Sequence, residues 1–320
     1  MSNPIKHHSV AQHVLRRFCD SDGVLWTYDK EKNQIYPGTP ASQARGKHFY
    51  SFKDCTGMKN TKIEKFLSQV DYAGSIAIES LLRKERLTTE RALDFMQFTA
   101  AQMLRVETYF QRLEACLSPL LQESAKRMFK YDPEFKSRVT GRLKEIGASE
   151  TDIKGLFASL ARGEFKVTAN RDYLKATFLQ TLGTIVELFR RMRWCFLRIE
   201  GATERFVTSD NPLVLEDIGT DRPQPLGVAN PNIEVTMPLS PTVTAVGRWD
   251  GQTDYGVISV QPIKVINQRT IDQAHRFVYA SYRSDNLLKQ VVASQGKQAQ
   301  TRVVKIKQGE ATIMMPIYSN

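Results

Sequence analysis

Three of the five histidines of this chain lie within seven residues, at His7, His8 and His13. An imidazole has an unperturbed pKa of about 6.5, so it exchanges protons near neutral pH, and its neutral form is a common metal ligand. We therefore take His7 and His8 as candidate catalytic residues and a divalent metal as a candidate cofactor. The alternative is that paired histidines near an N-terminus are exposed and have no role.

A second chemical group follows four residues later. Gln12 and Arg16 are spaced i, i+4, so in a helix they share one face and can bind a phosphate or a carboxylate together. His8 lies one turn before Gln12 and is expected to join that face. We place Gln12 with the catalytic candidates and Arg16 with the substrate-binding ones.

Two further groups lie far downstream, and both are implied by the resemblance to a known family that is described below. Gln102 and Arg105 are spaced i, i+3 on a strongly predicted helix. Arginine is rarely buried unpaired, so we expect a partner for Arg105, with Asp210, Glu64 and a ligand phosphate as the open choices. The run from Ser209 to Pro212 ends a predicted strand. Its short polar side chains can shape a turn by bonding the backbone. Alternatively, Asp210 can orient a histidine or bind a cation, and we place it with the catalytic candidates.

The chain also resembles a known family. The runs HHSVAQHVLRRF, GVLWTYDK, TAAQMLR, FVTSDNP and INQRTIDQAHRFVYA are similar, in this order and over nearly the whole chain, to a mostly bacterial family, domain of unknown function 4238. Two departures are Ala11 in place of a proline and Asp71 where a glutamate is usual. The resemblance implies one shared polar site, since polar motif positions report binding or catalysis more often than packing. The residues that it implies are His7, His8, Gln12, Arg16, Gln102, Arg105, Thr208, Ser209, Asp210, Asn211 and Asn267.

The charge of the chain indicates its partners. Lysine and arginine number 45 against 34 acidic residues, a formal net charge of +11. This charge favours DNA, RNA or another anionic ligand as a partner, although basic proteins can also owe their charge to solubility. Arg190, Arg191, Arg193 and Trp194 form a secondary basic patch that could bind nucleic acid by charge and stacking, or be a solvated helix end.

Other classes of protein are disfavoured by what the sequence lacks. Cys19, Cys55, Cys116 and Cys195 have neither zinc-site nor disulfide spacing, and we expect reduced thiols. No apolar run approaches the ~18 residues of a membrane span, so we expect a cytoplasmic protein with no membrane partner. The phosphate-binding and hydrolase motifs GxxxxGK[ST], GxGxxG, HExxH and GxSxG are absent.

The elements that must position these residues predict an α+β, mostly helical fold. We expect one integrated domain over residues 1–320, in which residues 1–60 form a small mixed unit with a β-hairpin, 61–191 a helical bundle, and 192–320 an antiparallel β-rich region with a helix. The predicted helices span 10–18, 62–85, 91–117 with a kink or end at Pro119, 133–146, 150–162, 169–190 and 265–282. The predicted strands are 23–29 and 33–37 in the hairpin, one near 50, five between 194 and 260, and two at 301–307 and 311–318, with a loop over 219–231.

Three functions fit these observations. The favoured one is a nucleic-acid enzyme that cleaves phosphodiester bonds, serving as a bacterial toxin or phage-defence effector, with His8 as general base or metal ligand and Arg16 and Arg105 holding phosphate. The second is an enzyme for a nucleotide-like small ligand, which predicts a deep enclosed pocket. The third is a non-catalytic protein that binds nucleic acid or another partner. Gln102, Ser209, Asn211 and Asn267 are the remaining substrate-binding candidates.

Overall fold

The computed structural model describes residues 7–8, 10–43, 45–46, 52–53, 59–60, 62–162, 164, 178–219, 227–251, 253–297, 300–308 and 311–319. At 7–8, 45–46, 52–53, 59–60, 62, 300–308 and 311–319 it describes the backbone alone. The helices are α1 (Gln12–Arg17), α2 (Pro40–Gln43), α3 (Lys62–Leu82), α4 (Thr89–Leu104), α5 (Glu107–Tyr131), α6 (Pro133–Glu145), α7 (Glu150–Arg162), α9 (Phe178–Arg191), α10 (Val260–Gln273) and α11 (Asp285–Ala293). The strands are β1 (His7–His8), β2 (Leu25–Asp29), β3 (Gln34–Gly38), β4 (Arg45–Gly46), β5 (Phe52–Lys53), β6 (Lys59–Asn60), β7 (Arg193–Ile199), β8 (Thr208–Ser209), β9 (Val214–Asp217), β10 (Ile233–Ser240), β11 (Val243–Arg248), β12 (Asp254–Ile258), β13 (Phe277–Ala280), β14 (Gln300–Gln308) and β15 (Ala311–Ser319).

The predicted α+β class is confirmed, and a five-stranded sheet lies at the centre of the body. Its strand order is β12-β7-β11-β10-β9, and every residue of β10 is buried. The expectation of a purely antiparallel sheet is wrong at one edge, where β12 pairs parallel to β7. Strand β12 runs antiparallel to β11, which precedes it in sequence, but that edge of β11 is already paired with β7. Strand β12 therefore pairs with the outer edge of β7, and these two strands run in the same direction.

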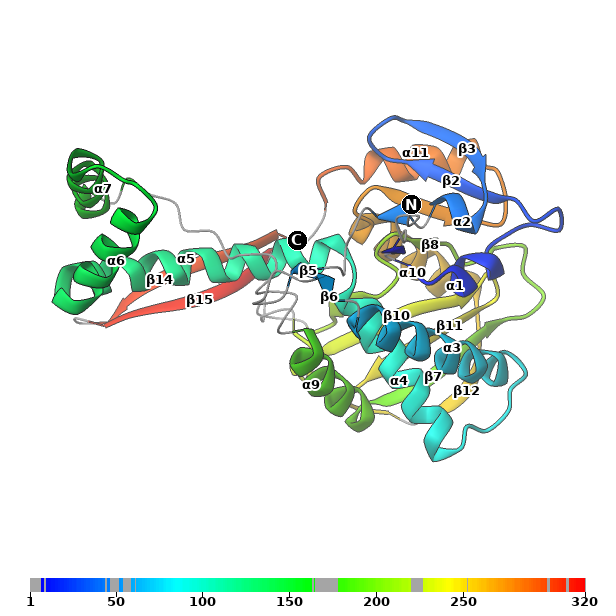
Figure 1. Ribbon diagram of the computed structural model, residues 1–320. Helices are drawn as coiled ribbons and strands as arrows, with labels where there is room; N and C mark the ends of the chain where they lie inside the picture. Colours follow the sequence, from blue (N-terminus) through cyan, green and yellow to red (C-terminus); the bar gives the residue numbers. More distant parts are fainter. Residues whose placement is uncertain are drawn as a thin grey trace.

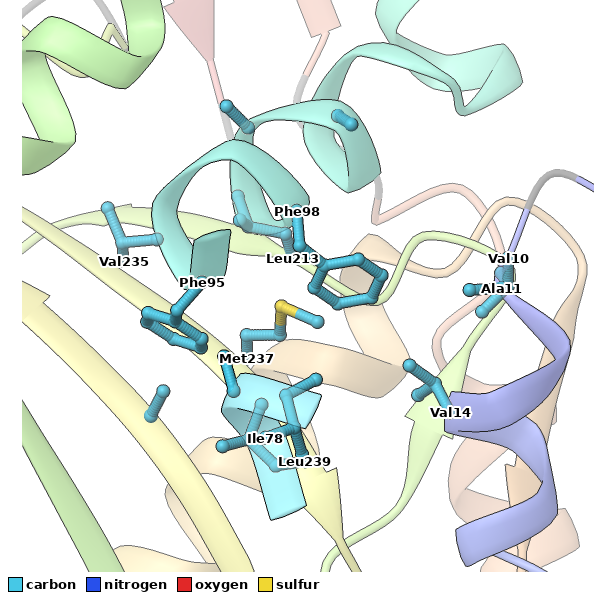
Figure 2. Packing of buried hydrophobic residues seen from close by; sticks show 14 of the residues in the cluster. Val10, Ala11, Val14, Ile78, Phe95, Phe98, Leu213, Val235, Met237 and Leu239 are labelled. Carbon is cyan, nitrogen blue, oxygen red and sulfur yellow. The ribbon is translucent and has the colours of Figure 1, made fainter. Parts of the chain in front are cut away.

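Helices α3 and α4 cover this sheet as an antiparallel pair. Thr88 caps α4 by accepting a hydrogen bond from the Arg91 N–H. Figure 2 shows Phe95 and Phe98 of α4 and Ile78 of α3 facing Met237 and Leu239 of β10. The buried face of α1 completes this core, with Val10, Ala11, Val14, Leu15 and Phe18 all nearly inaccessible to solvent, as the i, i+3, i+4 spacing predicts.

A second, four-stranded sheet joins the N-terminal hairpin to strands from far downstream in the chain. The predicted hairpin β2–β3 is confirmed, and β2 pairs antiparallel with β13, which pairs with β8. The helix predicted over 265–282 is wrong in its second half, because α10 ends at Gln273 and Phe277–Ala280 is a strand. The cause is Asp210, whose carboxylate accepts the N–H groups of the intervening turn.

The long helix predicted over 91–117 is also wrong, since it consists of two helices. Arg105 ends α4 and Val106 is extended, with φ −93° and ψ 150°, so α5 begins anew at Glu107. Pro119 lies inside α5 and does not end it. The turn at Arg105 directs α5 away from the body (Figure 1).

The helices predicted between 62 and 191 pack in two groups. Helices α3, α4 and α9 pack together in the body, whereas α5, α6 and α7 project from it as an arm, alongside the β14–β15 hairpin (Figure 1). Phe129, Phe135 and Phe157 form the small aromatic centre of this arm, with ring centroids 5.1 and 5.3 Å from Phe129. The predicted tail strands are confirmed as β14 and β15.

Some predictions fall largely outside the described residues. They are the strand near residue 50, of which only β5 is described, the first part of the helix over 169–190, and the centre of the loop over 219–231. Among the described residues, Cys19, Cys116 and Cys195 are not joined in disulfides. Within the described ranges, no helix has both the length and the apolar character to cross a bilayer.

Candidate functional site at α1, α3 and α4

Arg105 is a charged residue buried inside the protein. Its side chain is 2% exposed at the end of α4, and its guanidinium lies over the Phe98 ring, 5.7 Å from the centroid. Nη1 donates to both carboxylate oxygens of Asp71 on α3, at 2.8 and 2.9 Å. The partner of Arg105 is therefore Asp71, and neither Asp210 nor Glu64, the two carboxylates considered from sequence. The carboxylate that pairs with it is at the position where the family usually has glutamate.

The opposite edge of this guanidinium is unpartnered. Arg105 Nε and Nη2 are buried and have no hydrogen-bond acceptor among the described residues. In an arginine these two nitrogens point the same way and form a planar fork that fits two oxygens of one carboxylate or phosphate. An unsatisfied buried donor costs about 1–3 kcal/mol, so two of them on one charged group require an explanation.

Gln102 lies one turn before Arg105 on the same helix and has the same property. Its side chain is 0% exposed, and neither its amide nitrogen nor its amide oxygen has a partner in the described part of the chain. The predicted i, i+3 arrangement thus puts an unpaired amide beside an unpaired guanidinium edge, both inside the protein. Gln102 offers one acceptor and two donors to anything that binds there.

His13 of α1 faces the same place from the other side. Its ring lies against the ring of Phe98, with centroids 4.9 Å apart, so Phe98 touches both His13 and Arg105. His13 Nε2 is buried and has no described partner. Burial, together with the charges of Arg17, Arg105 and Arg16, lowers the pKa of His13 to about 3, so the ring is neutral at physiological pH. A neutral imidazole can donate or accept one hydrogen bond here, or bind a metal.

Gln12 and Arg16 form the predicted pair on the outer face of α1. Arg16 Nη2 donates to Gln12 Oε1 at 3.2 Å, and Arg16 is exposed. On the same helix, Arg17 is tied to α3 through Glu79, with 2.8 Å between Nη2 and Oε1. The contact between Arg17 and Glu79 holds α1 against α3, and His13 of α1 then lies against Phe98.

The two candidate catalytic histidines directly precede this helix. His7 and His8 form strand β1, which pairs antiparallel with Arg45 and Gly46 of β4. Their side chains lie outside the described residues, so their predicted roles stay predictions. Val10 and Ala11 lead into α1, and Figure 2 shows them with Val14 and Phe98 in one hydrophobic core.

Asp210 lies elsewhere: it follows β8, and its side chain contacts the turn between α10 and β13. One of its oxygens accepts the N–H of His275 at 2.8 Å, and the other accepts those of Arg276 and Phe277 at 2.8 and 3.0 Å. Burial raises the pKa of the Asp210 carboxyl, while these donors oppose that shift. The Asp210 carboxylate thus accepts hydrogen bonds from three backbone N–H groups and shapes the turn that contains them.

The other motif residues of this region also bond the backbone. Ser209 Oγ donates to the Asn211 carbonyl at 2.8 Å, and Asn211 Nδ2 donates to the Gln273 carbonyl at 2.9 Å. Asn267 accepts from the Val207 N–H at 3.0 Å and donates to the Arg205 carbonyl at 2.8 Å. The Thr208 hydroxyl is buried without a described partner.

The root of the arm lies against the turn that Asp210 shapes. Gln111 and His275 are 3.2 Å apart at their side-chain Nε2 atoms, and Arg112 Nη2 donates to Gln273 Oε1 at 2.7 Å. The structure therefore brings Gln102, Arg105 and the neighbourhood of α1 together as one cluster, and Ser209, Asp210, Asn211 and Asn267 as another.

Two members of the first cluster were not among the predicted site residues. His13 lies in the histidine-rich run without being a candidate residue, and Asp71 is only a departure from the family pattern. The available signal for His13 was its position between Gln12 and the two following arginines. Within the described residues, no group of three or more histidine, cysteine, aspartate or glutamate side chains could hold a metal ion.

The comparisons with known proteins give one family. A family model described as "Protein of unknown function (DUF4238)" matches residues 6–284, which include α1, α3, α4 and the Asp210 turn. Curated proteins and solved structures gave no match. Because the family model covers most of the chain, this protein belongs to the DUF4238 family.

Proposed function

We propose that this protein is an enzyme acting on a phosphate ester, and that the phosphate group binds the free edge of Arg105. The observation that carries the proposal is the pair of buried donors, Nε and Nη2, which no described residue satisfies. An anion with two oxygens in one plane completes this fork, and Asp71 on the other side keeps the guanidinium in place. Gln102 is then available to a neighbouring hydroxyl or ester oxygen.

The burial of the cluster favours a small, nucleotide-like ligand. Arg105 and Gln102 are almost completely enclosed, so a ligand reaches them only by entering the protein. A small phosphate ester can be enclosed in this way, whereas an intact duplex presents its phosphates on a broad surface. Neutral His13 adds a hydrogen bond without adding charge.

The test is ligand binding by the full chain. We expect inorganic phosphate and nucleoside phosphates to bind the wild type in isothermal titration calorimetry, and Arg105→Lys to weaken binding about tenfold or more, since lysine keeps the charge toward Asp71 but lacks the fork. Arg91→Lys is the matched control, because Arg91 lies on the same helix and pairs with Asp94. Equal affinity of wild type and Arg105→Lys would refute the proposed phosphate site.

Phosphodiester cleavage of DNA or RNA is the second candidate. Two observations favour it: the net charge of +11, and the histidine strand β1 that leads into α1. His8 would be the general base or a metal ligand, and a role as toxin or phage-defence effector belongs to this candidate. The assay is incubation of wild type and His8→Ala with plasmid, single-stranded DNA and tRNA, with and without Mg²⁺ or Mn²⁺. Cleavage by the wild type alone supports the candidate, and intact substrates throughout reject it.

A further inference from the structure

A groove of about 640 Å³ lies on the body away from the Arg105 cluster. It is bounded by the connection from α3 to α4, the end of α9, and strands β7 and β12. The side chains that define it are apolar at the floor and mostly cationic at the rim. Its volume is in the range of pockets that hold small organic ligands, about 300–1,000 Å³.

The floor is aromatic. The Phe95 ring stands perpendicular to Trp194, at 5.3 Å between centroids, and at a steep angle to Phe196, at 5.6 Å. Trp194 is 2% exposed, and its indole N–H donates to the Phe189 carbonyl at 3.0 Å. The suggestion that Trp194 stacks on bases at the surface is therefore wrong, because the ring is part of the core beneath the groove.

The rim carries four cations, Lys84, Arg86, Arg190 and Arg193, and one acid, Asp254. Two of these cations have ion-pair partners. Lys84 Nζ lies 3.1 Å from Glu200, and Arg190 Nη1 lies 3.0 Å from Glu187. Among the described residues, Arg86 and Arg193 have no ion pair, so their charges are available to a ligand.

We propose that this groove binds a small amphipathic anion, a molecule with an aromatic body and one carboxylate, sulfonate or phosphate group. The aromatic body is expected to cover Phe95, Met96 and Phe196, and the anionic group to lie between Arg86 and Arg193. Apolar burial and charge pairing act on opposite ends of such a ligand, which fixes its orientation. The groove shares no residue with the Arg105 cluster and does not depend on its function.

The experiment uses anilinonaphthalene sulfonate as the probe and the neutral dye phenylnaphthylamine for comparison. We expect the sulfonate to bind the folded protein at one saturable site, with energy transfer from Trp194, and naphthyl phosphate and naphthoate to displace it. The double variant Arg86→Gln with Arg193→Gln should weaken sulfonate binding about tenfold, the loss of one or two charge-assisted hydrogen bonds, and leave binding of the neutral dye unchanged.

The matched control is Arg190→Gln, which removes a rim cation that Glu187 already neutralises and should change affinity less than about threefold. A second variant, Ala92→Phe, fills the groove from α4 and should abolish dye binding while the thermal midpoint stays near that of the wild type. Unchanged sulfonate binding in both the double variant and Ala92→Phe would overturn the proposal. Displacement by anionic phospholipid vesicles or oligonucleotides, but not by naphthyl phosphate or naphthoate, would also overturn it.

Discussion

Arg105 binds Asp71 through one terminal nitrogen alone: Nη1 contacts both carboxylate oxygens, at 2.8 and 2.9 Å, while the edge formed by Nε and Nη2 stays buried and unsatisfied in the described structure. A guanidinium placed for stability would be expected to use that edge, because buried unpaired donors are costly. The arrangement separates two tasks. Asp71 holds the charge in the protein, and the free edge remains for a ligand.

Removing the Asp71 carboxylate should destabilise the protein. We expect Asp71→Asn to lower the free energy of unfolding by about 2 kcal/mol, less than the 3–5 kcal/mol of a fully buried pair, because Asp71 is 29% exposed. Asp71→Glu, which restores the residue usual in the family, should recover most of this loss. Urea unfolding of the three proteins measures it. Equal losses in Asp71→Asn and Asp71→Glu would show that charge at this position is not what stabilises Arg105.

Gly74 sets the distance between α3 and α4. A Cβ at this position would lie 2.4 Å from Cβ of Phe98, the residue that touches His13 and Arg105. We expect Gly74→Ala to displace Phe98, to destabilise the protein by about 1–3 kcal/mol, and to weaken phosphate binding at the Arg105 edge.

The control for that variant is Gly183→Ala in α9, where an added Cβ meets no atom within 4 Å. There alanine should stabilise the helix by about 0.5–1 kcal/mol through its higher propensity. Thermal unfolding of both variants decides the matter. A stabilised Gly74→Ala would mean that the close approach of the two helices is not required.

His13 should make stability depend on pH. Its pKa is about 6.5 in an unfolded chain and about 3 in the folded one, so below pH 6.5 the unfolded state takes up a proton that the folded state does not. The free energy of unfolding therefore decreases as the pH falls through this window, by up to about 1.4 kcal/mol per pH unit. Urea titrations at pH 7.5 and pH 5 should show a smaller difference for His13→Gln than for the wild type. Identical differences in the two proteins would contradict this assignment.

Asp210 should matter for folding more than for binding. Asparagine keeps one acceptor oxygen but turns an NH2 group toward at least one of the three backbone donors. Asp210→Asn should therefore cost about 2–3 kcal/mol of stability, the value of a lost charge-assisted hydrogen bond. The folded variant should bind phosphate as the wild type does. A stable Asp210→Asn protein without activity would instead support the catalytic role predicted from the sequence.

Local pattern was enough to predict much of this fold. The apolar spacing of α1, the Thr88 cap and the turn between β2 and β3 are encoded within a few residues, and each was predictable. The break at Arg105 was not, because Arg105, Val106 and their neighbours all tolerate a helix and the turn depends on a carboxylate 34 residues away. The strand at Phe277 was hidden for the same reason, since Asp210 interrupts the helix from a distant part of the chain.

The site was predictable in its chemistry but only partly in its geometry. The resemblance to the family points to Gln102 and Arg105, and their i, i+3 spacing puts both on the buried face of α4. The grouping of Asp210 with these two residues stays a prediction. Its carboxylate oxygens bond the turn at His275, and no hydrogen bond or ion pair of the described residues links it to Gln102 or Arg105. Sequence gives the residue types that can converge, whereas long-range pairing decides which ones do.

The pairing of β2 with β13 has a consequence for how the protein is made. During translation the N-terminal hairpin leaves the ribosome early, but the strand that completes its sheet is synthesised near the end of the chain. Segments begin to fold as they emerge from the ribosome. One edge of β2 therefore stays unpaired until its partner β13, around Phe277, has been synthesised. The nascent chain is thus expected to depend on chaperones until its last quarter is released, and C-terminal truncation should yield aggregated protein instead of a smaller folded one.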